Sequence, residues 1–240
     1  DLNWAELQDK NNNRLRACLG ISAVRIMEEG DAVWDKAAIV SAKRKILQAD
    51  ESMMIAVTPA GMDTSVQIPG ETVIAIFLKE LRLAADGYLL KQARKKHLDV
   101  PHITSFEVRH CCVGVPAAAP QKYKSLMQKA AQAAGFDSCT VRMESTAAAM
   151  AYGLAFSAVK NKKQTILVFD MGGGTTDITI AEKTSDESYH VLQTLGDTHL
   201  GGDDMDQALC EWVLQQHSDL SSTPLLVRKC RDAKIQLCNG

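Results

Sequence analysis

The sequence lacks several features that would assign a chain of this size to a specialised class. Its 240 residues carry a net charge of only -2, which gives no electrostatic case for a nucleic-acid or anionic membrane partner. No apolar run is long enough to span a bilayer, and neither an internal repeat nor a low-complexity tract is present. With 46% hydrophobic residues, the composition indicates a globular chain with a sizeable core.

The seven cysteines include no Cys-x-x-Cys pair and no metal-ligand spacing with histidine. A reducing compartment is the simplest interpretation, so we expect a cytoplasmic protein. The start of the chain does not resemble a signal peptide, while the missing initial Met leaves a removed organellar leader open. Cys111 and Cys112 lie in an apolar segment and are expected to be buried thiols that behave as small hydrophobic side chains.

The most informative stretch is residues 168–177, VFDMGGGTTD. Residues 165–170 predict a buried strand and residues 177–181 a returning strand, with the three glycines as the turn between them. Glycine permits a positive φ and has no Cβ, so consecutive amides could form an anion-binding concavity. Asp170 and Asp177 flank the turn, where one carboxylate could hold a hydrated Mg²⁺ and the other orient water. A glycine hairpin without any ligand is the alternative.

Helical and strand-like segments alternate along the chain, which indicates an α/β architecture. Besides the hairpin, the pattern predicts strands at 16–22 and 23–27 and helices at 35–47, 69–97 and 120–134, with Ser145 and Thr146 capping a further helix. Gly135 is expected to close the third of these helices. The second helix is expected to pack through side chains at helical intervals, namely Val73, Phe77, Leu81, Ala84 and Tyr88. The polar segment 160–164 is the expected domain boundary.

Four blocks resemble the 70-kDa heat-shock chaperone family and follow one another in that family's order. Residues 143–154, MESTAAAMAYGL, resemble its connecting segment NEPTAAAIAYGL, and residues 196–206, GDTHLGGDDMD, are similar to its GDTHLGGEDFD. Residues 113–117, VGVPA, resemble its VTVPA, and the glycine hairpin is the fourth block. A sugar or acetate kinase of the wider actin superfold would share the hairpin but not the GDTHLGG block, so it ranks lower.

The resemblance implies a partial actin-like ATPase fold of the α/β class with two ribonuclease H-like lobes. Residues 1–160 would form part of lobe I, and residues 161–240 part of a truncated lobe II that carries the second phosphate loop. A nucleotide-binding domain of this kind would bind ATP or ADP with Mg²⁺ and hydrolyse ATP slowly to drive protein folding. Its partners would be co-chaperones and unfolded client proteins. The alternative is a divergent, non-hydrolysing relative that acts as a scaffold, a ribosome-associated partner or a nucleotide-exchange factor.

The resemblance also implies roles for individual residues. The glycine turn and Thr175 would contact the β- and γ-phosphates, and Lys43 would approach the γ-phosphate, although a basic helix face can also be merely solvated. Asp170 and Glu144 would hold Mg²⁺ through water, and Asp177 would help to arrange the attacking water. The implied catalytic residues are Lys43, Glu144, Asp170, Thr175 and Asp177. The implied nucleotide-binding residues are Gly172, Gly173, Gly174, Thr175, Gly201, Gly202, Asp203 and Lys234.

Several positions depart from the family pattern. The first phosphate loop, GIDLGTT, has no clear counterpart, although residues 18–30 could hold its remnant strands, and the second adenosine motif is not visible. Arg231 stands where a glutamate normally meets the ribose, Ile235 replaces an arginine that stacks on adenine, and Cys238 replaces a serine. These departures favour the non-hydrolysing alternative, whereas the retained acidic residues and Thr175 favour an ATPase.

Overall fold

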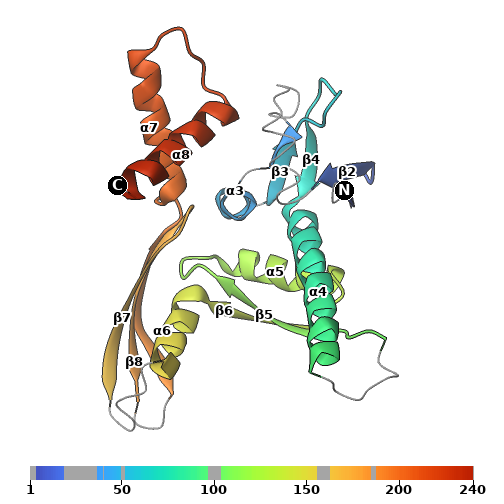
Figure 1. The fold of residues 1–240 in the computed structure, drawn as a ribbon, viewed down its shortest axis with the longest axis vertical. Helices are drawn as coiled ribbons and strands as arrows, with labels where there is room; N and C mark the ends of the chain where they lie inside the picture. The colour runs from blue at the N-terminus through green and yellow to red at the C-terminus, as the bar shows by residue number, and fades with distance from the viewer. Residues whose placement is uncertain are drawn as a thin grey trace.

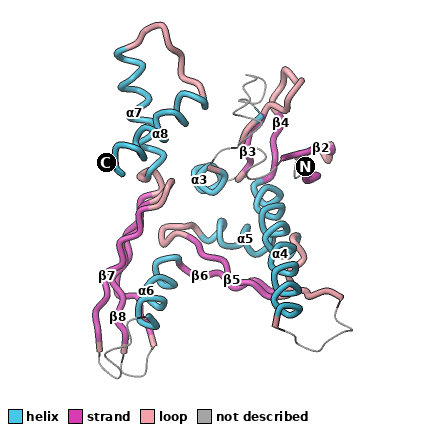
Figure 2. The backbone as a smooth tube through the Cα atoms, viewed as in Figure 1, coloured by secondary structure: helices cyan, strands magenta, loops and turns pink. Residues whose placement is uncertain are grey.

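The computed structural model describes residues 4–18, 37–39, 41–49, 52–96, 104–155, 163–184 and 188–239. In chain order its elements are β1 (Trp4–Gln8), β2 (Arg14–Cys18), α3 (Ala42–Gln48), β3 (Met54–Val57), β4 (Val66–Pro69), α4 (Gly70–Lys95), β5 (His110–Val115), α5 (Gln121–Ala133), β6 (Ser138–Met143), α6 (Glu144–Ala155), β7 (Gln164–Met171), β8 (Thr176–Lys183), β9 (Tyr189–Asp197), α7 (Gly202–Gln216) and α8 (Pro224–Asn239). The chain is therefore of the mixed α/β class, as predicted, and Figure 2 shows how helices and strands are interleaved in space.

The described strands form four small sheets. The pairs β1–β2 and β3–β4 are antiparallel, β5 and β6 are parallel, and β7, β8 and β9 form an antiparallel meander. The meander extends along one side of the molecule, with α7 and α8 beyond one end of it (Figure 1). Within the meander Asp170 lies directly opposite Asp177, so the predicted hairpin of β7 and β8 is confirmed. The prediction that residues 165–170 form a buried strand is wrong, because only Ile166 is buried there, while Leu167 and Phe169 are 67% and 62% exposed.

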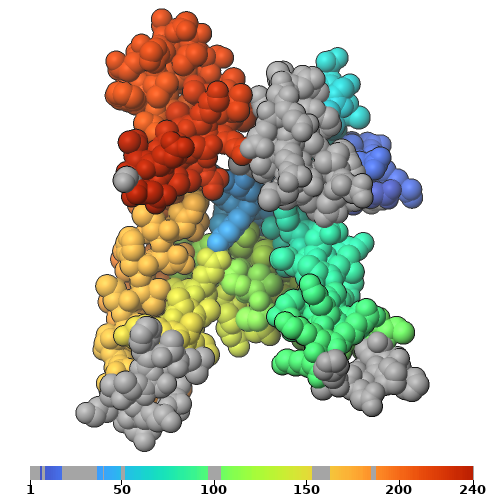
Figure 3. Space-filling model, in the orientation of Figure 1, coloured from blue at the N-terminus to red at the C-terminus, as the bar shows by residue number. Residues whose placement is uncertain are grey.

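The short helix α3 occupies a central position. In the space-filling view its atoms lie between α8 and the beginning of α4 (Figure 3). Ile46 is its one buried residue and packs into the main core with Ile55, Ile68 and Val73. Complete burial of one such side chain contributes roughly 1.5–3 kcal/mol, and the partly buried Ala42 and Leu47 pack against the same core.

The helix α5 agrees closely with the sequence prediction. Pro120 precedes it, and Gly135 follows it with a φ of 90°, the left-handed conformation expected after a helix C-terminus. Apolar residues recur at three- and four-residue intervals and face the core, led by Tyr123, which is 1% exposed. This helix supports the parallel strands β5 and β6, which both lead toward the centre of the molecule (Figure 1).

The prediction for α4 is right in extent but wrong in its buried face. Of the five predicted side chains only Val73 is buried, and the exposed ones are Phe77, Leu81, Ala84 and Tyr88. The middle of α4 makes polar contacts: Arg82 donates to the Ala134 carbonyl at 3.1 Å, and Asp86 accepts from the Val108 amide at 2.7 Å. Near the end of the helix Ala93 is buried. Within the described ranges, no helix combines the length and apolar character needed to cross a bilayer.

Other boundaries differ from the predictions. Within the range 35–47 the structure describes residues 37–39 and 41–47, and α3 begins only at Ala42, because the backbone of Ser41 is left-handed, with a φ of 52°. The helix α6 begins at Glu144 rather than after a Ser145 cap, because the Ser145 hydroxyl is buried and accepts a bond from Thr179 at 2.8 Å. The strand expected at 23–27 lies outside the described residues, and 16–22 and 160–164 do so in part.

Candidate functional site

The turn between β7 and β8 is fixed by backbone hydrogen bonds. The Gly172 amide donates to the Thr175 carbonyl at 2.8 Å and closes the turn. The first amides of α7, those of Gly202 and Asp203, donate to the carbonyls of Gly172 and Gly173 at 3.0 and 2.7 Å. These bonds satisfy two of the amides that a helix N-terminus leaves without intrahelical partners. The turn and α7 therefore form one continuous backbone unit.

The three glycines of the turn do not use the positive φ that glycine permits. Glycine is required instead where another part of the backbone leaves no room for a Cβ, and this applies most strongly to Gly201. A Cβ on Gly201 would lie 2.5 Å from the Gly173 carbonyl oxygen, whereas a Cβ on Gly172 would meet no atom nearer than 3.6 Å. A Cβ on Gly174 would lie 3.2 Å from the side chain of Arg44. The turn thus packs tightly against the start of α7 and against α3.

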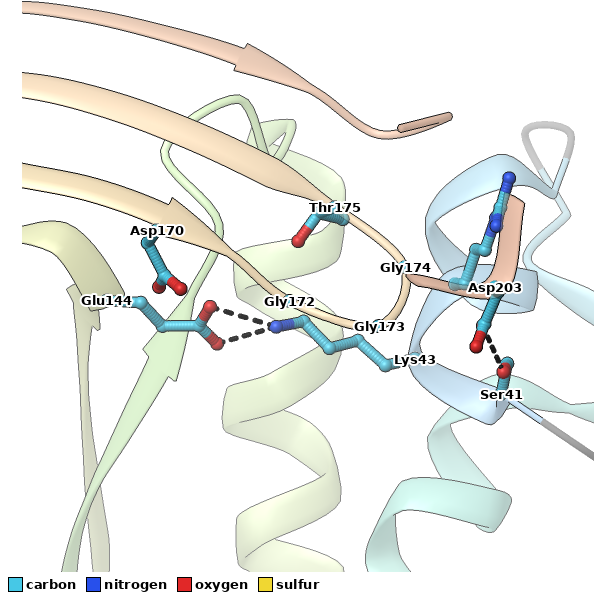
Figure 4. Close-up of a pocket in the computed structure, with 10 residues that line it drawn as sticks. Ser41, Lys43, Glu144, Asp170, Gly172, Gly173, Gly174, Thr175 and Asp203 are labelled. Atoms are coloured by element: carbon cyan, nitrogen blue, oxygen red, sulfur yellow. Dashed lines mark hydrogen bonds and ion pairs between the residues drawn. The ribbon is translucent and has the colours of Figure 1, made fainter. Parts of the chain in front are cut away.

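A cavity of about 200 Å³ opens beside this turn (Figure 4). Three separate parts of the chain surround it: α3, the start of α6, and the β7–β8 turn with the start of α7. Its lining residues are Ser41, Lys43, Arg44, Glu144, Asp170, Gly172, Gly173, Gly174, Thr175 and Asp203. The fold therefore gathers most of the residues singled out in the sequence around one space.

Lys43 and Glu144 meet across this cavity (Figure 4). The Lys43 Nζ donates to both carboxylate oxygens of Glu144, at 2.7 and 2.9 Å. The two side chains keep 44% and 29% of their surface exposed, so the pair is solvated and exchangeable. Glu144 passes close to Gly114, where an added Cβ would lie 2.8 Å from the Glu144 Cγ. The contact with Gly114 therefore restricts the Glu144 side chain, whereas the more exposed Lys43 side chain is less restricted.

The two aspartates that flank the turn have different environments. Asp170 lines the cavity, whereas Asp177 is 2% exposed and is not among the residues that line it. An Asp177 oxygen accepts from the Ala117 amide at 3.1 Å, and a Cβ on Gly196 would lie 2.6 Å from that oxygen. Burial raises the pKa of Asp177, and the negative charges of Glu144 and Asp170 raise it further. The hydrogen bond from the Ala117 amide lowers this pKa, but by less than burial raises it. Asp177 therefore lies behind the wall of the cavity, and its role with the attacking water stays a prediction.

Two contacts between α3 and α7 were not anticipated from the sequence. The Ser41 hydroxyl donates to an Asp203 oxygen at 2.5 Å, and Arg44 forms an ion pair with Asp204. The hydrogen bond that the Arg44 guanidinium donates within this ion pair is the main reason that the pKa of Asp204 is lowered. Ser41 could have been taken for a helix cap, but its side chain makes no capping bond. No local signal in the sequence pairs these residues, because the two pairs are 162 and 160 positions apart.

The remaining predicted nucleotide contacts fall into two groups. Asp203 lines the cavity, while Gly201 and Gly202 lie behind the turn as part of its backbone support. The Lys234 ammonium is engaged away from the cavity, at 3.0 Å from the Gly202 carbonyl and 2.5 Å from a buried Asp206 oxygen. Lys234 therefore braces α8 against the start of α7.

The donor set of the cavity fits a phosphate group and a hydrated cation. Lys43, Arg44 and the Thr175 hydroxyl supply positive charge and donors, and Asp170 and Glu144 supply carboxylates. Among the described residues, no three Asp, Glu, His or Cys side chains are gathered closely enough to bind a metal ion directly. Mg²⁺ commonly keeps several waters and needs only one or two protein carboxylates, which matches this pair.

Comparisons with known proteins agree with the resemblance of the four blocks. A family model described as "Hsp70 protein" matches residues 34–238. The chaperone protein dnaK of Guillardia theta is 37% identical over 141 residues, which is 55% of this chain and 22% of that protein. DnaK of Thermosipho melanesiensis is 33% identical over 211 residues, 82% of this chain and 32% of that protein. The chain thus spans between a fifth and a third of the length of these relatives.

Proposed function

The chain belongs to the Hsp70 family, and from this membership we propose that it is part of a nucleotide-binding domain that binds MgATP and hydrolyses ATP slowly. The proposal includes a partial actin-like fold with one lobe over residues 1–160 and a second over residues 161–240. The whole protein would act as a chaperone in the cytoplasm, with unfolded proteins and co-chaperones as its partners.

One observation supports the proposal more than any other. Lys43, Glu144, Asp170 and Thr175, which are distant in the sequence, line the same cavity beside the glycine turn. Ligand pockets usually enclose roughly 300–1,000 Å³. A cavity of about 200 Å³ is therefore suited to the phosphate tail of a nucleotide rather than to a whole nucleotide. The described residues would hold the tail, and the remainder of the nucleotide would lie outside this cavity.

Phosphoryl transfer requires positioning and charge stabilisation more than covalent help from the protein. Lys43 is suited to donate to phosphate oxygens, because it and its present partner Glu144 are both partly exposed, so it can leave that carboxylate at small free-energy cost. Glu144, once released by Lys43, is suited to accept a hydrogen bond from water and orient it. Thr175 and the turn would position the phosphate chain, and the buried Asp177 would hold the Ala117 segment in place rather than touch the substrate.

Bound Mg²⁺ would supply charge neutralisation of the phosphates, and Asp170 and Glu144 are the residues that would hold its water shell. Both carboxylates line the cavity, and both are half-buried. Asp170 extends from the end of β7 and Glu144 from the start of α6, so two different elements would position the ion.

A non-hydrolysing scaffold is the second candidate, and particular residues favour it. Arg231 and Ile235 on α8 replace the side chains that the family uses around adenosine, and Lys234 is already engaged by Asp206. Weak nucleotide binding would follow if no other residues compensate. The two candidates differ in whether bound ATP is turned over.

The test is MgATP binding by titration calorimetry together with single-turnover hydrolysis of radiolabelled ATP. Thr175→Ala and Lys43→Ala are each expected to reduce turnover at least tenfold, because each removes a group beside the phosphate tail. Matched controls are Thr165→Ala, on the exposed side of β7, and Lys129→Ala, on the exposed side of α5, and both should behave as wild type. Binding without turnover would support the scaffold, and no binding would exclude both ATP-dependent functions.

A further inference from the structure

Cys111 and Cys139 lie directly opposite each other on the parallel strands β5 and β6. Opposed residues of neighbouring strands project to the same face of the sheet, and these two face the layer of helices, where both pack against Ala131, Ala134 and Phe136. Neighbouring strands lie about 4.8 Å apart, which is within the range of roughly 4.4–6.8 Å between Cα atoms that a disulfide can bridge. The register of the two strands therefore places the Cα atoms of Cys111 and Cys139 within bridging range.

The two thiols are also accessible, contrary to the expectation of fully buried cysteines in this strand. Cys111 and Cys139 are both half-buried, whereas Cys210 and Cys230 between α7 and α8 are 0% and 5% exposed. Cys112 is exposed, but its partner in register is Thr140, and it projects to the other face of the sheet. Among the thiols of these two strands, the geometry favours only the pair Cys111 and Cys139.

We propose that Cys111 and Cys139 form a thiol–disulfide redox site that reacts with an oxidised low-molecular-weight thiol such as glutathione disulfide. The Cys139 sulfur attacks one sulfur of that disulfide and releases one small thiol. The Cys111 sulfur then attacks the Cys139 sulfur and releases the second. Two protein thiols lose two electrons and two protons, and the small disulfide gains them as two thiols.

The order of attack follows from the surroundings of Cys111. Burial, with a further contribution from the adjacent Cys139 thiol, raises the pKa of Cys111 to about 12, so it is a weak nucleophile while both thiols are free. A mixed disulfide on Cys139 removes the contribution of that thiol.

The Cys111–Cys139 disulfide would join the two strands that lead into the candidate site. β5 continues into Ala117, whose amide binds Asp177, and β6 continues directly into Glu144. Oxidation would fix the separation of the two strands that carry these groups. The redox site itself does not depend on nucleotide binding, so it stands or falls separately from the proposed function.

The test uses the folded wild-type protein, incubated with glutathione disulfide, alkylated, digested and analysed by mass spectrometry. We expect a linked peptide pair containing Cys111 and Cys139, 2 Da lighter than the two reduced peptides and abolished by dithiothreitol. Cys112→Ser should retain the link, because Cys112 faces away, and Cys139→Ser should lose it.

A second measurement does not depend on the folding of any variant. In 6 M urea the wild-type cysteines should pair without this preference, since the register of the strands is lost. If the folded protein shows only glutathione adducts, or if Cys112 links to Cys139 as often as Cys111 does, the proposal is wrong. Equal linkage in the folded and the urea-treated protein would also overturn it.

Discussion

The two walls of the candidate site are built differently. The wall formed by the β7–β8 turn and the start of α7 is held by backbone hydrogen bonds of 2.7–3.0 Å and by a glycine contact without room for a side chain. The opposite wall is α3, a helix of seven residues with one buried side chain, whose polar groups reach across to their partners. Rigid backbone on one side and exchangeable ion pairs on the other would let the cavity keep its shape while it binds and releases a charged ligand.

The largest expected effect tests the rigid wall. Gly201→Ala should reduce the free energy of unfolding by about 2–3 kcal/mol, because the added methyl group would lie 2.5 Å from a backbone oxygen that cannot rotate away. The cause is steric only, since Gly201 has an extended backbone with a φ of -172° that any residue can adopt. Urea denaturation followed by circular dichroism measures the change.

Gly172→Ala serves as the matched control for stability. A Cβ there would lie 3.6 Å from its nearest neighbour, an ordinary contact, so the expected change is below about 0.5 kcal/mol. Equal destabilisation by the two substitutions would show that the turn tolerates no side chain anywhere. The close contact with α7 would then have no special importance.

The next effect tests the attachment of α3. Arg44→Ala should destabilise the protein by about 1 kcal/mol, because the side chain is only 18% exposed and its loss removes the Asp204 ion pair and the packing on Gly174. Arg109→Ala is the control, since that side chain is 61% exposed and pairs only on the surface, and it should change stability by less than 0.5 kcal/mol or so. If Arg44→Ala were more damaging than Gly201→Ala, α3 would be the rigid wall.

Much of the fold was predictable because its signals are local. The β7–β8 hairpin follows from alternating apolar residues around three glycines, and α5 follows from Pro120, an apolar stripe and Gly135. The buried face of α4 was not predictable in the same way. In the middle of α4, Arg82 and Asp86 form hydrogen bonds with other segments, and hydrophobic periodicity carries no information about such contacts.

The candidate site was predictable as a set of residues but not as an arrangement. The resemblance named Lys43, Glu144 and Asp170, which do line one cavity, and it also named Asp177, which is buried behind it. The pairing of Ser41 with Asp203 depends on how α3 meets α7, and this is decided by packing over the whole chain. Sequence motifs identify residue types at fixed spacing, whereas the depth of each side chain follows from tertiary structure.

A smaller effect concerns the pH dependence of stability that arises from the buried Asp177 at the start of β8. The pKa of Asp177 is raised in the folded protein, so the folded state binds a proton more tightly than the unfolded state does. The stability contributed by this proton is complete below the ordinary pKa and is lost as pH rises through the higher folded value. Asp177→Asn keeps an oxygen for the Ala117 amide and should therefore be more stable than wild type at pH 7.

Thermal melts of Asp177→Asn and wild type between pH 3.5 and pH 8 measure this difference. The two curves should converge at the acidic end, where the wild-type carboxyl group is protonated and carries no charge to bury. A variant that is less stable than wild type at pH 7 would mean that the ionised carboxylate contributes to folding. The buried aspartate would then be an ordinary structural anchor.

The smallest expected effect distinguishes the exchangeable pair from a structural one. Lys43 and Glu144 have short contacts of 2.7 and 2.9 Å, yet 44% and 29% of their side-chain surface is exposed, so water and salt screen the attraction. A double-mutant cycle of Lys43→Met and Glu144→Gln should give a coupling of about 0.5 kcal/mol or less, and 1 M salt should abolish it. A coupling above that of Arg44 with Asp204 would mean that a ligand must break a strong bond to enter, and an easily exchanged ammonium group could no longer explain how the cavity accepts phosphate.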